Sequence, residues 1–170
     1  MVRTDVMSLI ERLGALPGLE ELLLTSNGAQ LDKYAESLKA SGVSRINISI
    51  DSLDADRFKR ISRVGKLEKV LAGIDACISA GIKRIRLNAV IMRGYNEDEV
   101  LNLTDYAIEK GVDIAFIEEM PLGEASDHDR KDTTCSNDWV RNIIEEKYQL
   151  SDSEDSTAGP SRYTSVAGSN

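Results

Sequence analysis

The stretch "RINISIDS", residues 45–52, decides the fold of this chain. Isoleucine occupies positions 46, 48 and 50, and Asn47, Ser49 and Asp51 alternate with it. Because successive side chains of a strand point to opposite faces, the pattern predicts a strand with one apolar and one polar face. We expect the apolar face to pack against helices.

A second segment, "RIRLNAVIM" at residues 84–92, alternates in the same way and places Arg86 and Asn88 on its polar face. Buried polar groups need hydrogen-bond partners. Two arrangements supply them: the ligand-filled lumen of a partial barrel, or an open sheet with one wet face. In the barrel, Thr25, Ser49 and Arg86 would line one cavity at the carboxyl ends of their strands, where barrels of alternating strands and helices place their sites.

Helices and strands alternate along the whole chain. The periodicity predicts strands at 21–25, 45–51, 84–92 and 112–119, and helices at 6–16, 31–41, 54–61, 67–80, 97–110 and 137–148. Gly42, Gly81 and Gly111 should end three of the helices, and Asn96 should cap the helix at 97–110. This rhythm predicts an α/β fold with about four parallel strands, right-handed crossovers and flanking helices.

The chain divides into two parts. Residues 1–150 are expected to form an incomplete (β/α) barrel core, and residues 151–170, which lack periodicity, a linker or tail. A complete barrel of this kind has about eight strands. The sheet edges at 22–25 and 112–119 would therefore be exposed, which predicts self-association, for example as a homodimer.

Charge and hydropathy restrict the function classes. The chain has 21 Lys and Arg residues against 29 Asp and Glu, a net charge of −8. An acidic surface disfavours nucleic-acid binding, although a few placed arginines can still bind a small anion. No apolar run approaches the roughly 20 residues of a membrane helix, and the first residues carry no signal-peptide pattern. We expect a cytoplasmic protein that contacts no membrane.

Metal ligands are scarce in the sequence. Cys77, Cys135 and His128 are its only cysteines and histidine, which is too few for an ordinary zinc site, and no metal site is predicted. Cys77 lies in an apolar helical stretch and is expected to be buried, whereas Cys135 should be a free thiol in a polar loop. His128 belongs to a segment expected to be a solvated loop. No catalytic residue stands out.

Five ordered stretches of the chain resemble a known family. They are "LTSNG" (24–28), "RINISIDSLDADRF" (45–58), "VLAGIDA" (70–76), "LNAVIMRGYNEDEV" (87–100) and "FIEEMPLG" (116–123). They are similar to the radical S-adenosylmethionine (SAM) lyases that act as GTP 3',8-cyclases in molybdenum-cofactor biosynthesis. The resemblance implies a partial barrel, SAM and 4Fe–4S clusters as cofactors, and rearrangement of GTP to 3',8-cyclo-7,8-dihydro-GTP. It also implies a downstream partner in the pathway, the cyclic pyranopterin monophosphate synthase.

The resemblance assigns roles to individual residues. Thr25 and Arg86 match positions that contact GTP, with arginine at 86 where the family usually has lysine. Ser49 and Met120 match positions that contact SAM, Met120 through its backbone. Ala115 stands where the family often has an arginine facing the substrate. For Glu118–Met120, the residues alone leave ligand contact and an internal salt bridge equally open.

The sequence departs from the family in its cluster ligands. It contains no Cys-x3-Cys-x2-Cys motif, no Gly-Gly-Glu-Pro motif and no C-terminal cysteine motif. We therefore expect a central fragment of the enzyme that is inactive by itself. Two alternatives stay open from the residues: a non-catalytic module that binds nucleotide, SAM or a partner protein, and a truncated reading frame without a role.

Overall fold

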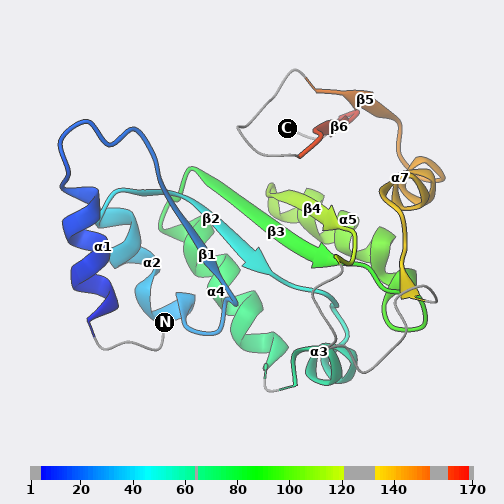
Figure 1. Cartoon of the computed structure of the whole chain (residues 1–170), viewed down its shortest axis with the longest axis horizontal. Coiled ribbons are helices and arrows are strands. Elements are labelled where there is room, and N and C mark those ends of the chain that lie inside the picture. The colour runs from blue at the N-terminus through cyan, green and yellow to red at the C-terminus, as the bar shows by residue number, and fades with distance from the viewer. Residues whose placement is uncertain (1–4, 64, 121–132, 154–160, 169–170) are drawn as a thin grey trace.

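The structure, a computed structural model, describes residues 5–63, 65–120, 133–153 and 161–168. Its centre is a parallel sheet with the strand order β1-β2-β3-β4. The strands are β1 (Leu22–Ser26), β2 (Val43–Ser49), β3 (Arg84–Val90) and β4 (Asp113–Ile117). Figure 1 shows them side by side in this order. The predicted α/β class with about four parallel strands is confirmed.

One helix precedes the first strand, and the others lie between successive strands of the chain. The helices are α1 (Val6–Gly14), α2 (Leu31–Ala40), α3 (Ala55–Ser62), α4 (Leu67–Ser79), α5 (Val100–Lys110) and α7 (Asn137–Glu145), with the 3-10 turn η1 (Glu97–Glu99) before α5. Gly42, Gly81 and Gly111 follow α2, α4 and α5 with positive φ angles, as the helix-ending role requires. Asp54 caps α3, because its side chain accepts a hydrogen bond from the backbone N–H of Arg57.

The core lies on one face of the sheet. Ile46, Ile48 and Leu87 are fully buried there, together with residues of α2, α4 and α5: Leu31, Leu38, Val70, Ile74, Val100 and Leu103. These helices cover the apolar face that the alternation in β2 and β3 predicted. The polar residues of the same strands are consequently left on the opposite face.

The start of the predicted helix at 97–110 differs from expectation. Its first three residues form the 3-10 turn η1, and Asn96 makes no side-chain cap to the helix. The Asn96 amide instead donates to the carbonyls of Asp51 and Val90, and its oxygen accepts from the N–H of Met92. Asn96 therefore fastens the ends of two strands together, and the prediction of a helix cap is wrong.

The segment after residue 150 is not uniformly irregular. Two short strands, β5 (Leu150–Asp152) and β6 (Thr164–Val166), pair in antiparallel fashion. The sequence did not predict these strands, and the division into a core and a linker or tail stays a prediction. Figure 1 shows this pair on the side of the sheet away from α4.

Two further findings bear on the sequence-based expectations. In the described part of the chain, β1 and β4 are the outer strands of the sheet, as predicted for its exposed edges. None of the helices in the described ranges is long and apolar enough to cross a bilayer.

Candidate functional site

The polar face of the sheet is arranged in rows by strand register. Thr25 of β1 pairs with Asn47 of β2, Asn47 with Arg86 of β3, and Arg86 with Asp113 of β4. Neighbouring strands of a sheet lie about 4.8 Å apart. The two predicted substrate residues, Thr25 and Arg86, are thus separated only by Asn47.

The next row toward the carboxyl ends contains the predicted SAM residue. Ser49 is the last residue of β2, and it pairs with Asn88, which pairs with Ala115 of β4. Ser49 and Thr25 are exposed. Ala115 does share the face with the predicted site residues, so the position where the family often has an arginine lies beside Asn88.

Arg86 is not placed as expected. It lies near the amino end of β3 and its residue is only 8% exposed. Thr25 and Ser49 lie at the carboxyl ends of their strands, as expected, whereas the expected position at the carboxyl end is wrong for Arg86, because β1 is short and its carboxyl end lies in register with the first half of β3. Arg86 belongs to the row of Thr25 and not to that of Ser49.

The guanidinium of Arg86 has two partners. Its Nη2 donates a hydrogen bond of 2.7 Å to the hydroxyl of Tyr163, whose ring centre lies 4.9 Å from the guanidinium carbon. The same nitrogen lies 3.7 Å from the carboxylate of Asp113. Stacking on a ring and pairing with a carboxylate are the two contacts that a planar guanidinium makes best.

A second arginine shares both partners. Arg84 donates to Asp113 through Nε at 3.0 Å, and its guanidinium lies 5.8 Å from the ring of Tyr163. Two guanidinium groups thus face one carboxylate and one neutral ring. Among the described residues, the cluster gathers two cationic side chains in a chain that is acidic overall. Such a cluster is suited to binding a phosphate or carboxylate group.

Asn47 contributes an unsatisfied acceptor to the same row. Its Oδ1 is buried and has no hydrogen-bond partner. A buried polar atom without a partner is costly, so it favours a ligand or water that donates a hydrogen bond at this point. Since Asn47 lies between Thr25 and Arg86, the position that needs a hydrogen-bond donor is in the middle of the predicted substrate row.

The carboxyl edge of the sheet is held by a polar network. Asp51, two residues after Ser49, accepts a hydrogen bond of 2.8 Å from the N–H of Val90. Burial raises the pKa of the Asp51 carboxyl, an effect that the hydrogen bond from Val90 partly offsets. With the Asn96 contacts, this network fixes the end of β2 against the end of β3, next to Ser49.

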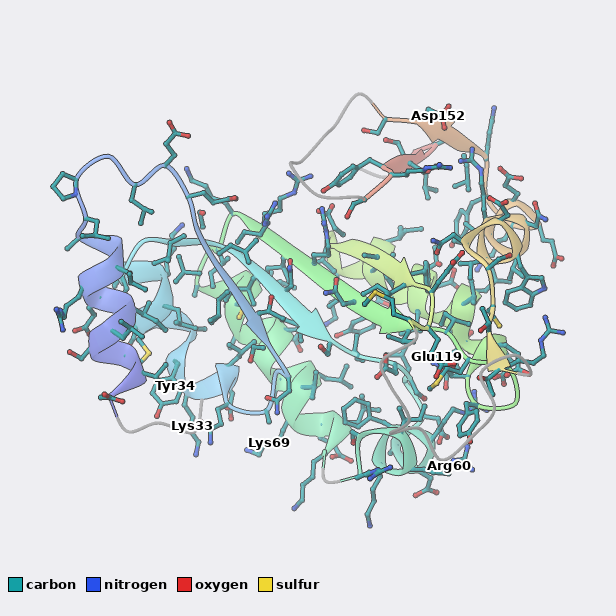
Figure 2. The ribbon with its side chains drawn as sticks, in the orientation of Figure 1. Lys33, Tyr34, Arg60, Lys69, Glu119 and Asp152 are labelled. Carbon is teal, nitrogen blue, oxygen red and sulfur yellow. The ribbon has the colours of Figure 1, made fainter. Side chains whose placement is uncertain are left out.

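The segment after β4 lies at the same edge. Met120 follows β4 by three residues and is 61% exposed, and Figure 2 shows its neighbour Glu119 beyond the carboxyl ends of the strands. The Glu118 carboxylate accepts from the N–H of Asn137, and that of Glu119 from the hydroxyl of Thr133. Both glutamates therefore make hydrogen bonds within the protein, and the choice between ligand contact and a salt bridge stays open.

Both cysteines are free thiols and both are buried, which confirms the expected burial of Cys77 and the expected free thiol at Cys135. Burial raises the pKa of the Cys77 thiol to about 11 and also raises that of Cys135, where the Arg93 side chain acts in the opposite sense. Among the described residues, no three His, Cys, Asp or Glu side chains gather as metal ligands. His128 and its neighbours 129–132 lie outside the described residues.

Two hollows in the described part of the chain lie away from the polar face. One is lined by residues of α1 and α2, including Glu11 and Ser37, and the other by Arg57, Asp98 and Glu99. Neither contains Thr25 or Arg86. A cavity shared by the predicted site residues therefore stays a prediction.

Sequence reasoning missed two partners of the site. Asp113 could have been found, because the alternation in "DIAFI" places it on the face of Ala115. Tyr163 could not, because it lies 77 positions from Arg86 in a segment without periodicity. Only the return of the chain over the sheet brings it to the guanidinium.

The fold and these motifs define a class. Residues 1–107 match the model of the radical SAM superfamily, and the chain belongs to that superfamily. The chain is 50% identical over 167 residues to the GTP 3',8-cyclase of Pseudomonas entomophila (strain L48), an alignment that covers 98% of this chain and 50% of the relative. It is 54% identical over 163 residues to GTP 3',8-cyclase 1 of Pseudomonas aeruginosa PAO1, covering 96% of this chain and 49% of that protein.

A solved structure supports the fold. The chain is similar to the structure of TYW1 with a lysine-pyruvate adduct bound, with a TM-score of 0.64 and 24% identity, over 90% of this chain and 50% of that one. At this identity the likeness bears on the fold alone. The chain spans about half the length of the curated relatives it matches.

Proposed function

We propose that the chain is part of a GTP 3',8-cyclase, a radical SAM lyase of molybdenum-cofactor biosynthesis. The observation that carries the proposal is the row Thr25–Asn47–Arg86 on the polar face, in a chain about half of whose residues are identical to those of curated cyclases. Since those relatives are cyclases, they support this function over a non-catalytic binding module.

Arg86 and Thr25 are proposed to bind the nucleotide. The two guanidinium groups of the Arg84–Arg86–Asp113 cluster are of the kind that binds phosphate groups. Thr25, one strand beyond Asn47, offers an exposed hydroxyl to the remainder of GTP. The unpartnered Oδ1 of Asn47 accepts a hydrogen bond from the amine or a hydroxyl of the bound nucleoside. Ala115, in the neighbouring row beside Asn88, adds no charge to the face.

Ser49 and Met120 are proposed to hold SAM at the carboxyl edge. The hydroxyl of Ser49 is exposed and can exchange hydrogen bonds with a ribose or an amino acid group. Met120 lies at the same edge, and its backbone can bind the adenine. When bound with its iron–sulfur cluster, SAM supplies the radical that starts the rearrangement of GTP.

The 4Fe–4S cluster does not fit the residues of this chain. Such a cluster takes several cysteine thiolates, and Cys77 and Cys135 are only two and both buried. The cluster ligands are therefore proposed to lie outside these 170 residues. We further propose that the cyclase works in the cytoplasm, forms a homodimer through exposed strand edges, and passes its product to the cyclic pyranopterin monophosphate synthase.

Ligand binding by the chain itself tests the proposed site. Thermal unfolding is measured with GTP, with SAM and without ligand, because a ligand that binds only the folded state raises its melting temperature. Thr25→Ala and Arg86→Ala should reduce the shift with GTP, and Ser49→Ala the shift with SAM. Lys83→Ala, at an exposed position just before β3, is the matched control. If GTP raises the melting temperatures of Arg86→Ala and Lys83→Ala by the same amount, Arg86 does not bind GTP.

Catalysis is tested by anaerobic cluster reconstitution. We expect the 170-residue chain to bind no stoichiometric cluster and to form no 5'-deoxyadenosine from SAM. Stoichiometric cluster binding or formation of 5'-deoxyadenosine would contradict the inactivity proposed for the isolated chain. A chain that carries the three cysteine ligands in addition should form 5'-deoxyadenosine only with the cluster, and cyclised GTP only while Arg86 is intact.

A further inference from the structure

Tyr163, the residue just before β6, contacts Arg86 on the polar face of the sheet. We propose that Tyr163 is a positioning residue that orients Arg86 toward the phosphate groups of the nucleotide. Nothing in the family motifs assigns a role to Tyr163. The inference deepens the proposed function and rests on it for the identity of the ligand.

The geometry of the contact suits orientation without blocking. A guanidinium has five N–H donors, all in its plane. The ring of Tyr163, 4.9 Å away, is placed for a cation–π contact with that group, and its hydroxyl takes one donor at 2.7 Å. A ring against the face of a guanidinium restrains its plane but consumes no in-plane donor. The contact with Tyr163 thus occupies one of the five N–H donors of Arg86.

The surrounding charges give the orientation its purpose. Asp113 lies 3.7 Å from Arg86 but 3.0 Å from Arg84, which makes Arg84 its closer partner. Arg86 is thus weakly paired with the carboxylate and is held mainly by Tyr163. Because an arginine side chain loses considerable rotamer freedom when it is fixed, a preformed orientation lowers the cost of binding an anion.

The contact also explains why the C-terminal segment approaches the sheet. Tyr163 immediately precedes β6, and β6 pairs with β5 across from the helices. Figure 2 labels Asp152 on β5, on this side of the molecule. The small antiparallel pair therefore serves as the support that carries Tyr163 to the guanidinium.

A double-mutant cycle on the chain tests the inference. Inorganic tripolyphosphate and GTP are titrated calorimetrically into the parent chain, Tyr163→Phe, Tyr163→Ala, Arg86→Ala and the double variant Arg86→Ala with Tyr163→Ala. The control is Tyr148→Phe. The hydroxyl of Tyr148 also makes a hydrogen bond to a charged group, although it donates to the carboxylate of Asp105, and its ring centre lies 5.2 Å from the Nζ of Lys147. Circular dichroism verifies that each variant is folded.

We expect Tyr163→Phe to weaken tripolyphosphate binding about fivefold and Tyr163→Ala about tenfold or more, as the loss of one or two contacts to a charged group predicts. In the Arg86→Ala background, Tyr163→Ala should change the affinity less than about twofold, since coupled residues are not additive. Tyr148→Phe should bind like the parent chain. A merely structural tyrosine would weaken binding equally in both backgrounds.

The outcomes separate this inference from the proposed function. If tripolyphosphate binds the parent chain and GTP does not, the cyclase assignment fails, and the tripolyphosphate cycle still decides the role of Tyr163. The inference would be overturned if Tyr163→Phe bound tripolyphosphate as tightly as the parent or more tightly. It would also be overturned if Tyr163→Ala lost the same affinity with and without Arg86. A parent chain that binds neither ligand would overturn it as well.

Discussion

The carboxylate of Glu99 lies 2.5 Å from the hydroxyl of Ser52, although the two residues are 47 positions apart. Its second oxygen accepts a hydrogen bond of 3.0 Å from the N–H of Leu53, and Arg57 donates to the first at 3.1 Å. Glu99 and Ser52 are both buried. One glutamate at the start of α5 thus holds the loop that follows β2, close to Ser49.

Removing the Glu99 carboxylate should destabilise the chain strongly. Glu99→Ala removes the acceptor of the buried Ser52 hydroxyl and of the Leu53 N–H and leaves Arg57 paired with Asp98, which should lower the free energy of unfolding by about 2–4 kcal/mol. Urea denaturation measures the change. Asp98→Ala is the control, because Asp98 also pairs with Arg57 but is 68% exposed, and its loss should cost below about 1 kcal/mol. Equal effects of the two variants would contradict the role given to Glu99.

The hydrogen bonds of Asn96 predict a second large loss. Its fully buried side chain bonds to Asp51, Val90 and Met92 at 2.7–2.9 Å. Asn96→Ala should lower the unfolding free energy by about 2–4 kcal/mol. Asn96→Asp should also be harmful, because it replaces a donor that serves two carbonyls by an acceptor. Asn142→Ala, at an exposed position of α7, is the control, and its free energy of unfolding should stay within about 0.5 kcal/mol of the parent value. An Asn96→Ala variant as stable as this control would contradict the role given to Asn96.

The sequence predicted the two faces of the sheet because strand geometry is local. In residues 45–51, the alternation of isoleucine with Asn47 and Ser49 is enough to assign each side chain to a face. The assignment agrees with the burial of Ile46 and Ile48 and with the exposure of Ser49. A pattern with a period of two residues needs no knowledge of the rest of the chain.

The partners of polar side chains were beyond the sequence for a physical reason. Asn96 precedes a helical pattern and has the residue type of a cap, yet it bonds the ends of β2 and β3. The carbonyls that it serves exist only once both strands are in register. The contact of Arg86 with Tyr163 likewise depends on the path of the chain after α7, which no local pattern encodes.

Gly28 should tolerate no side chain, for reasons of space. A Cβ at Gly28 would lie 2.7 Å from Cγ1 of Val70 and 3.1 Å from Cγ2 of Ile48. Gly28→Ala should cost about 3 kcal/mol or more, through both the overlap and its positive φ of 77°. Gly94 is the matched control, since its φ is 76° but no atom lies within 4 Å of an added Cβ.

The two glycine variants separate conformation from packing. Gly94→Ala should cost only about 1 kcal/mol, the price of the left-handed conformation alone. Chemical denaturation of both variants gives the difference, which is the part due to the contact of α4 with the turn after β1. If Gly28→Ala and Gly94→Ala lose the same stability, the close approach of Val70 to Gly28 is not a constraint.

The thiols of the folded chain should react slowly. Cys77 and Cys135 are both buried, and the pKa of Cys77 is raised to about 11 by burial. Because the thiolate is the reactive form, an aromatic disulfide reagent at mildly alkaline pH should modify the folded chain about 100-fold more slowly than the urea-unfolded chain. Cys77→Ala, followed in the same assay, assigns the remaining rate to Cys135. A thiol that reacts in the folded chain as fast as in urea would show that its burial is not maintained in solution.

Asp51 should make stability fall as the pH rises above 3.8, because burial raises the pKa of its carboxyl in the folded chain above that ordinary value. Between 3.8 and the raised pKa, the folded state binds more protons than the unfolded state, so the free energy of unfolding decreases with pH. Asp51→Asn keeps an acceptor for the N–H of Val90 and removes the charge. It should therefore unfold at higher urea than the parent near neutrality, and the difference should shrink in acid. Asp56→Asn, at an exposed position of α3, is the control. If Asp51→Asn were instead less stable than the parent near neutrality, and this loss became smaller in acid, the ionised carboxylate would stabilise the fold.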